Sequence, residues 1–168
     1  DQRGNEAFAD WDLDYEVYKE SVNADRANYE SLDYYMLYLH HNDYLIFMEM
    51  NNHAILNDDY YCGLFESLGV NPDKITEDTD FLVIQDAGKK VDYFEKFRES
   101  ENNITSDLGT IQIFASESGT YGAYLNGEEL FAVTPEQSQN PEIRIVVVDK
   151  STKEVTDQSC FSKRLQRI

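Results

Sequence analysis

The spacing of hydrophobic residues changes along this chain, and the change predicts helices in the first half and strands in the second. Residues 26–41 have an apolar residue every three or four positions, which predicts an amphipathic helix. Residues 58–68 repeat this spacing between an acidic start and a glycine stop, so we expect a second helix there. Short apolar runs at 44–50 and 81–84 predict strands, and the first run fits a strand that is buried on both faces.

Beyond residue 109 the chain becomes almost wholly β, because apolar and polar residues alternate. Between two of the predicted strands lies Asn126-Gly127, a dipeptide that tolerates the positive φ of a tight hairpin turn. The strands predicted in this half are 110–115, 121–125, 129–133, 143–149 and 154–161.

The strand predicted at 143–149 differs from its neighbours because both of its faces are mostly apolar. One face has Ile143, Ile145 and Val147, and the other has Arg144, Val146 and Val148. We therefore expect this strand to lie inside a sheet. Residues 91–94 fit either spacing and are predicted as a strand, whereas residues 99–108 are predicted to be a polar connector.

Helices followed by hairpins predict an α+β fold rather than alternating βαβ units. We expect two helices and at least six strands. Residues 1–24 are acidic and weakly periodic, which indicates an N-terminal arm or linker; residues 25–162 are the expected domain, and 163–168 a short basic tail.

The charge balance limits the classes of partner. Fourteen basic side chains face 33 acidic ones, a net charge of −19, which repels nucleic-acid phosphates and anionic lipid headgroups. We therefore expect no nucleic-acid partner. The sequence contains no run of 18 apolar residues, so it predicts no membrane-spanning helix, and we expect no membrane insertion of this segment. The chain begins at Asp1 without a methionine, so we expect a piece of a longer protein.

Metal and disulfide chemistry are weakly indicated. Cys62 and Cys160 belong to no Cys-x-x-Cys pattern, and each is predicted to be a small buried hydrophobe, with a disulfide between them as the alternative. The acidic residues of 10–14 occupy positions 1, 3 and 5 of a calcium loop. Tyr15 and Ser21 stand where that loop needs glycine and glutamate, so a looser calcium site in the arm remains the alternative.

Catalytic motifs are also missing from the sequence. It has no nucleophile elbow, no dinucleotide fingerprint and no phosphate-binding loop. A carboxylate pair for glycoside hydrolysis is not excluded, but with 33 acidic residues some pair always has a workable spacing. We expect no catalytic residue and no cofactor in this segment.

Several short stretches resemble the interleukin-like EMT inducer (ILEI) domain family. The final hairpin has the form of a hydrophobic run, an Asp, a turn and then x-V-x-D-x-x-x-F. The matching stretches are IRIVVVD (143–149), EVTDQSCF (154–161), IQIFAS (111–116), YLNGEEL (124–130), NDYLIFM (42–48), SLG (67–69) and FLVI (81–84).

This resemblance implies two antiparallel β-sheets packed face to face, a sandwich-like arrangement, with two flanking helices. It covers residues from about 30 to 162. It is similar to the type found in bacterial surface proteins, where the module is a C-terminal appendage to an SGNH-type acyltransferase or esterase. It implies an extracellular, bacterial cell-surface setting and no catalytic motif, and the remainder of the longer chain is an expected partner.

A lectin-like relative in the stem region of an animal glycosyltransferase extends the implication to glycan binding. We therefore expect a non-catalytic accessory module that binds a cell-surface glycan. The candidate ligand-binding residues are Trp11 in the arm and Tyr121, Tyr124 and Asn126 around the predicted hairpin. Two alternatives stay open: a structural or protein-interaction spacer without a small ligand, and a hydrolase or transferase domain.

Overall fold

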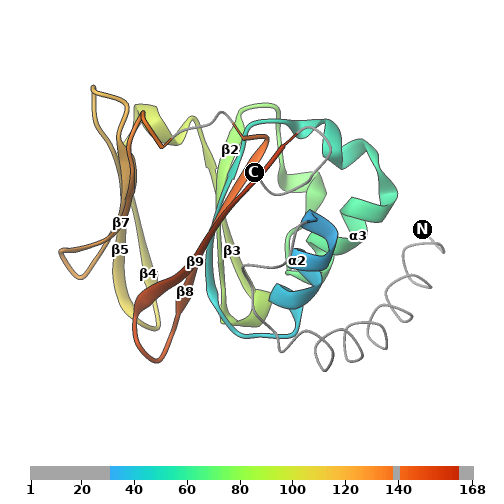
Figure 1. Cartoon of the computed structure of the whole chain (residues 1–168), viewed down its shortest axis with the longest axis horizontal. Helices are drawn as coiled ribbons and strands as arrows, with labels where there is room; N and C mark the ends of the chain where they lie inside the picture. The colour runs from blue at the N-terminus through green and yellow to red at the C-terminus, as the bar shows by residue number, and fades with distance from the viewer. Residues whose placement is uncertain (1–30, 138–140, 163–168) are drawn as a thin grey trace.

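Two antiparallel sheets and two α-helices make up the described part of the chain, residues 31–137 and 141–162, in a computed structural model (Figure 1). The predicted α+β class, with two packed sheets and two helices, is confirmed. The helices are α2 (Leu32–His40) and α3 (Asp59–Ser67). The strands are β1 (Leu45–Met50), β2 (Thr79–Gln85), β3 (Lys90–Glu95), β4 (Asn102–Ser106), β5 (Gly109–Ala115), β6 (Tyr121–Leu125), β7 (Glu128–Val133), β8 (Ile143–Asp149) and β9 (Glu154–Phe161).

The larger sheet joins the two ends of the described chain. Its strand order is β3-β2-β1-β8-β9, so β1 lies at the centre and pairs with β8, which follows it by more than 90 residues in sequence. The smaller sheet is a meander of consecutive strands in the order β4-β5-β6-β7. Both sheets are antiparallel at every strand pair.

The elements stack in three layers, with the larger sheet between the helices and the smaller sheet (Figure 1). Every residue of β1 is buried, as its apolar run predicts for a strand covered on both faces. Ile46 and Met48 belong to the core beneath the helices, whereas Leu45 and Phe47 belong to the core between the sheets. The period of two along a strand makes this division.

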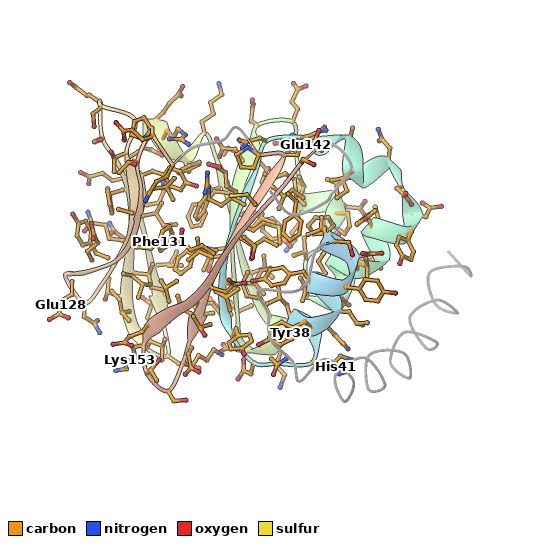
Figure 2. The ribbon with its side chains drawn as sticks, viewed as in Figure 1. Tyr38, His41, Glu128, Phe131, Glu142 and Lys153 are labelled. Atoms are coloured by element: carbon orange, nitrogen blue, oxygen red, sulfur yellow. The ribbon has the colours of Figure 1, made fainter. Side chains whose placement is uncertain are left out.

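The expected sides of β8 are confirmed. Ile143, Ile145 and Val147 pack in the helix-side core, and Val146 and Val148 pack in the inter-sheet core. Figure 2 shows side chains filling both layers, with Phe131 among those between the sheets and Tyr38 on the helix side.

Residues 99–108 are not a connector, and that prediction is wrong. They contain the end of a 3₁₀ turn, η5 (Phe97–Glu99), and the edge strand β4. Every second residue of β4 is exposed, and Ile104 is its one apolar contribution to the inter-sheet core. An edge strand with so little apolar content gives almost no hydrophobic signal.

Of the two predicted helices, the second has nearly the observed bounds. The helix predicted at 58–68 is α3, and its Asp58 side chain accepts a hydrogen bond from Tyr60 N at 2.9 Å, as an N-cap does. The helix predicted at 26–41 corresponds to α2 over 32–40; its first residues, like the predicted arm and basic tail, lie outside the described residues.

Candidate functional site

Of the four sequence-predicted ligand residues, the three that the structure describes do not come together. Trp11 lies outside the described residues. Tyr121 is 2% exposed and packs between the sheets, so the expectation that it offers a surface for a ligand is corrected. Its place at the start of β6, directly opposite Val133, turns the ring inward, whereas Tyr124 lies on the opposite face of the same strand.

Asn126 has a structural task. It lies in the β6–β7 turn with φ 53°, and its amide joins this turn to the neighbouring β4–β5 turn. Its Oδ1 accepts from Thr110 N at 3.0 Å and its Nδ2 donates to Leu108 O at 3.0 Å. Both ends of the amide are therefore occupied by backbone, although Asn126 also lines an open hollow of about 330 Å³ beside Glu128 and Lys153 at the hairpin tips (Figure 2).

Tyr124 does lie on a solvent-facing surface. Its ring packs against Phe114 of β5 with a centroid separation of 4.7 Å and an interplanar angle of 33°. Gln112 lies directly across from Tyr124 in the β5–β6 pair, and its side chain is exposed. These three side chains project away from the larger sheet, because the alternate residues Ile111 and Ile113 face inward.

A hollow of about 260 Å³ adjoins this aromatic pair, and we call it the outer-face hollow. It lies where the η5 turn and the residues after it pass beside β5. Its walls offer six polar or aromatic groups: an aromatic ring, an amide, a guanidinium, a hydroxyl and two carboxylates. Its lining residues are Arg98, Glu99, Ser100, Glu101, Gln112, Ile113, Phe114 and Ala115.

Behind this hollow lies a buried ionic cluster. Glu49 of β1 is 3% exposed and faces Arg144 of β8, which is 5% exposed, in direct cross-strand register. Arg144 Nε lies 3.7 Å from Glu49 Oε1, and Arg98 Nη2 donates to Glu49 Oε2 at 3.1 Å. Asn51 Nδ2 adds a hydrogen bond to Glu49 Oε1 at 3.3 Å. One buried carboxylate therefore lies within ion-pair distance of two guanidinium groups.

Arg98 connects the buried cluster to the outer-face hollow. Its side chain is 44% exposed, and its guanidinium carbon lies 4.5 Å from the Tyr121 ring centroid and 5.0 Å from that of Phe97. A guanidinium over an aromatic face is favourable because the ring face is electron-rich. Arg98 Nη1 also lies 3.5 Å from Gly119 O.

Burial beside this cluster raises the pKa values of two neighbouring side chains, Tyr121 and Asp80. Burial raises the pKa of Tyr121 well above its ordinary value, and the negative charge of Glu49 raises it further. Burial also raises the pKa of Asp80, although the hydrogen bond from Phe97 N and the charge of Arg98 oppose that shift. The Tyr121 hydroxyl therefore stays protonated at neutral pH.

The histidines and Cys62 have local structural contacts. His40 Nδ1 contacts Ser67 O at 3.1 Å, and His53 Nε2 contacts Thr79 O at 2.5 Å. Cys62 and Cys160 are half-buried, so the prediction that both are buried is corrected. Cys62 is a free thiol that donates to Leu56 O at 3.0 Å, and the alternative of a Cys62–Cys160 disulfide is not realised. Within residues 31–137 and 141–162, no three His, Cys, Asp or Glu side chains are grouped as metal ligands would be.

The buried Glu49–Arg144 pair was missed at the sequence level. The sequence does contain a signal, since Glu49 interrupts the apolar run of β1 and Arg144 interrupts that of β8. The register that brings them together becomes known only with the β1–β8 pairing.

No family model, curated protein or solved structure matches this chain. No helix of the described part is both long enough and apolar enough to span a membrane.

Proposed function

We propose that this protein is a non-catalytic accessory module that binds a cell-surface glycan at the outer-face hollow. The observation that carries the proposal is the Phe114–Tyr124 aromatic pair on the outer face of the smaller sheet, bordered by the hydrogen-bonding side chains of the hollow. The extracellular, bacterial setting belongs to the same proposal and is supported by the family resemblance and the acidic surface.

Sugars need the combination of groups that this surface offers. The C–H face of a pyranose ring stacks on an aromatic ring, which buries apolar area without requiring a deep pocket. Hydroxyl groups are both donors and acceptors, and they match the amide of Gln112 and the carboxylates of Glu99 and Glu101. A shallow, preformed hollow of about 260 Å³ has room for one or two sugar rings, so we expect weak, millimolar to micromolar affinity.

The test is a titration with a panel of oligosaccharides, including N-acetylhexosamine oligomers and teichoic-acid fragments, followed by calorimetry. At least one member should bind, and Phe114→Ala and Tyr124→Ala should each weaken that binding by about fivefold or more, as loss of a stacking contact implies. Tyr34→Ala is the matched control, because Tyr34 is 45% exposed on α2, in the layer on the far side of the larger sheet.

Binding that Tyr34→Ala weakens as much as Tyr124→Ala would argue against this surface. Binding of no sugar at millimolar concentration would favour the spacer alternative. Turnover of acyl or glycosyl reporter substrates would instead favour the hydrolase or transferase alternative.

A further inference from the structure

We propose that Arg98 is the specificity-determining residue of the outer-face hollow and that the hollow selects uncharged sugars over acidic ones. This inference rests on the proposed function and goes beyond it by naming the chemical class of the ligand and the residue that recognises it.

The guanidinium of Arg98 is held in one place from several sides. Its inner edge donates to the buried Glu49 carboxylate, and its flat face lies over the Tyr121 ring. Its partly exposed side chain lines the hollow. Guanidinium has five N–H donors, so the contacts to Glu49 and to Gly119 O leave others for a ligand oxygen. A donor that is already fixed loses little conformational entropy when a ligand binds.

The positive charge of Arg98 is partly offset inside the protein by a carboxylate that it shares with Arg144. Glu49 is 3% exposed and lies within ion-pair distance of both Arg98 and Arg144. The other charged residues that line the hollow are Glu99 and Glu101, both exposed carboxylates. The lining itself therefore has one cation and two anions, on a protein whose net charge is −19.

This charge distribution discriminates between classes of sugar. A uronic acid or another anionic sugar that approached Arg98 would also approach Glu99 and Glu101, and like charges repel. An uncharged sugar avoids this repulsion and still accepts hydrogen bonds from Arg98 through a hydroxyl or acetamido oxygen. Its hydroxyl protons can in turn be donated to Glu99, Glu101 or the Gln112 carbonyl.

The test compares a neutral oligosaccharide, chitotetraose, with an acidic one, tetragalacturonate, by calorimetry at low and high salt. We expect chitotetraose to bind at least about tenfold more tightly at low salt, with the difference shrinking at high salt as the carboxylates are screened. Arg98→Lys should weaken chitotetraose binding about tenfold, because lysine keeps the charge but lacks the planar fork.

Two further variants separate the parts of the argument. Glu99→Gln combined with Glu101→Gln should narrow the preference for chitotetraose over tetragalacturonate, because it removes the repulsion of the acidic sugar while the amide oxygens still accept from hydroxyl groups. Lys74→Ala is the matched control for Arg98→Lys, since Lys74 also lies over an aromatic ring, that of Tyr93 at 5.8 Å, but outside the hollow. Circular dichroism of each variant checks that it remains folded.

The outcomes distinguish this inference from the proposed function. If chitotetraose binds and is weakened by Phe114→Ala but not by Arg98→Lys, the glycan-binding function stands and the role of Arg98 is overturned. If tetragalacturonate binds as tightly as chitotetraose, the selection of uncharged sugars is overturned. If neither those two nor any other sugar of the panel binds, the inference falls together with the proposed function.

Discussion

Replacing Glu49 with glutamine tests whether the buried ionic cluster organises the region behind the outer-face hollow. The substitution keeps the size of the side chain and removes its charge. Arg144, which is 5% exposed, then loses its carboxylate partner. Among the described residues, the Gln137 carbonyl at 3.4 Å is the hydrogen-bond acceptor that remains. Arg144 Nε is already buried without a hydrogen-bond partner in the described structure, so Glu49 Oε1 at 3.7 Å supplies its main compensation.

The expected magnitude follows from the burial of both partners. Removing one member of a buried ion pair typically costs about 3–5 kcal/mol, because the other charge stays in a low-dielectric environment. We therefore expect Glu49→Gln to lower the free energy of unfolding by about 4 kcal/mol. Arg144→Met should cost less, about 1–3 kcal/mol, since Glu49 keeps the hydrogen bond from Arg98 at 3.1 Å.

The double variant Glu49→Met with Arg144→Met completes the comparison. An apolar pair of similar volume often replaces a buried ion pair with little loss, so we expect it within about 2 kcal/mol of the parent protein. Arg98, at 44% exposure, can then be hydrated.

The assay is urea unfolding followed by circular dichroism. With an m-value of about 2 kcal/mol per M, a loss of about 4 kcal/mol lowers the midpoint by about 2 M. A Glu49→Gln midpoint within about 0.3 M of the parent would refute the reasoning, as would a double variant less stable than Glu49→Gln.

Three other properties can be predicted from local geometry. Gly109→Ala should lower the free energy of unfolding by about 1–3 kcal/mol in urea titrations, because Gly109 has φ +128° and an added Cβ would meet the Asn126 amide; no change in stability would contradict this. Burial, and after it the nearby Asp59 carboxylate, raises the pKa of Cys62. Alkylation of Cys62 at neutral pH, followed by peptide mass, should therefore be much slower in the native protein than in urea. Equal alkylation rates in the two states would contradict this. Burial raises the pKa of Tyr61 from 10.0 to about 12, so the native state keeps this proton at pH values where the unfolded chain loses it. The free energy of unfolding should therefore fall between pH 10.0 and about 12, and it should fall less steeply in Tyr61→Phe. An identical alkaline profile for Tyr61→Phe would exclude that contribution.

The sequence predicts much of the fold because hydrophobic spacing reports burial directly. The doubly buried strands β1 and β8 are runs of apolar residues, and the β6–β7 hairpin has an Asn-Gly turn. The edge strand β4 is missed because its polar residues face solvent. The separation of the strands into two sheets is not encoded in local spacing, since β1 pairs with β8 across most of the chain.

The candidate site is predicted less well for a related reason. The alternation of side chains along β6 shows that Tyr121 and Tyr124 face opposite sides of the sheet, but it does not show which side is covered. The larger sheet covers the side of Tyr121, so only Tyr124 remains on the surface beside Phe114. Arg98 and the hollow it lines depend on how the η5 turn passes β5, a contact between segments that no local pattern describes.

The most direct measurement of the central claim is a nitrogen-15 chemical-shift titration of the protein with chitotetraose. Glycan binding at the outer-face hollow predicts saturable shifts at the amides of Gln112, Phe114 and Tyr124 and at the residues of the η5 turn. The hollow beside Glu128 and Lys153, which lacks an aromatic ring, should not respond. Shifts confined to that second hollow, or no shifts at all at millimolar sugar, would contradict the account.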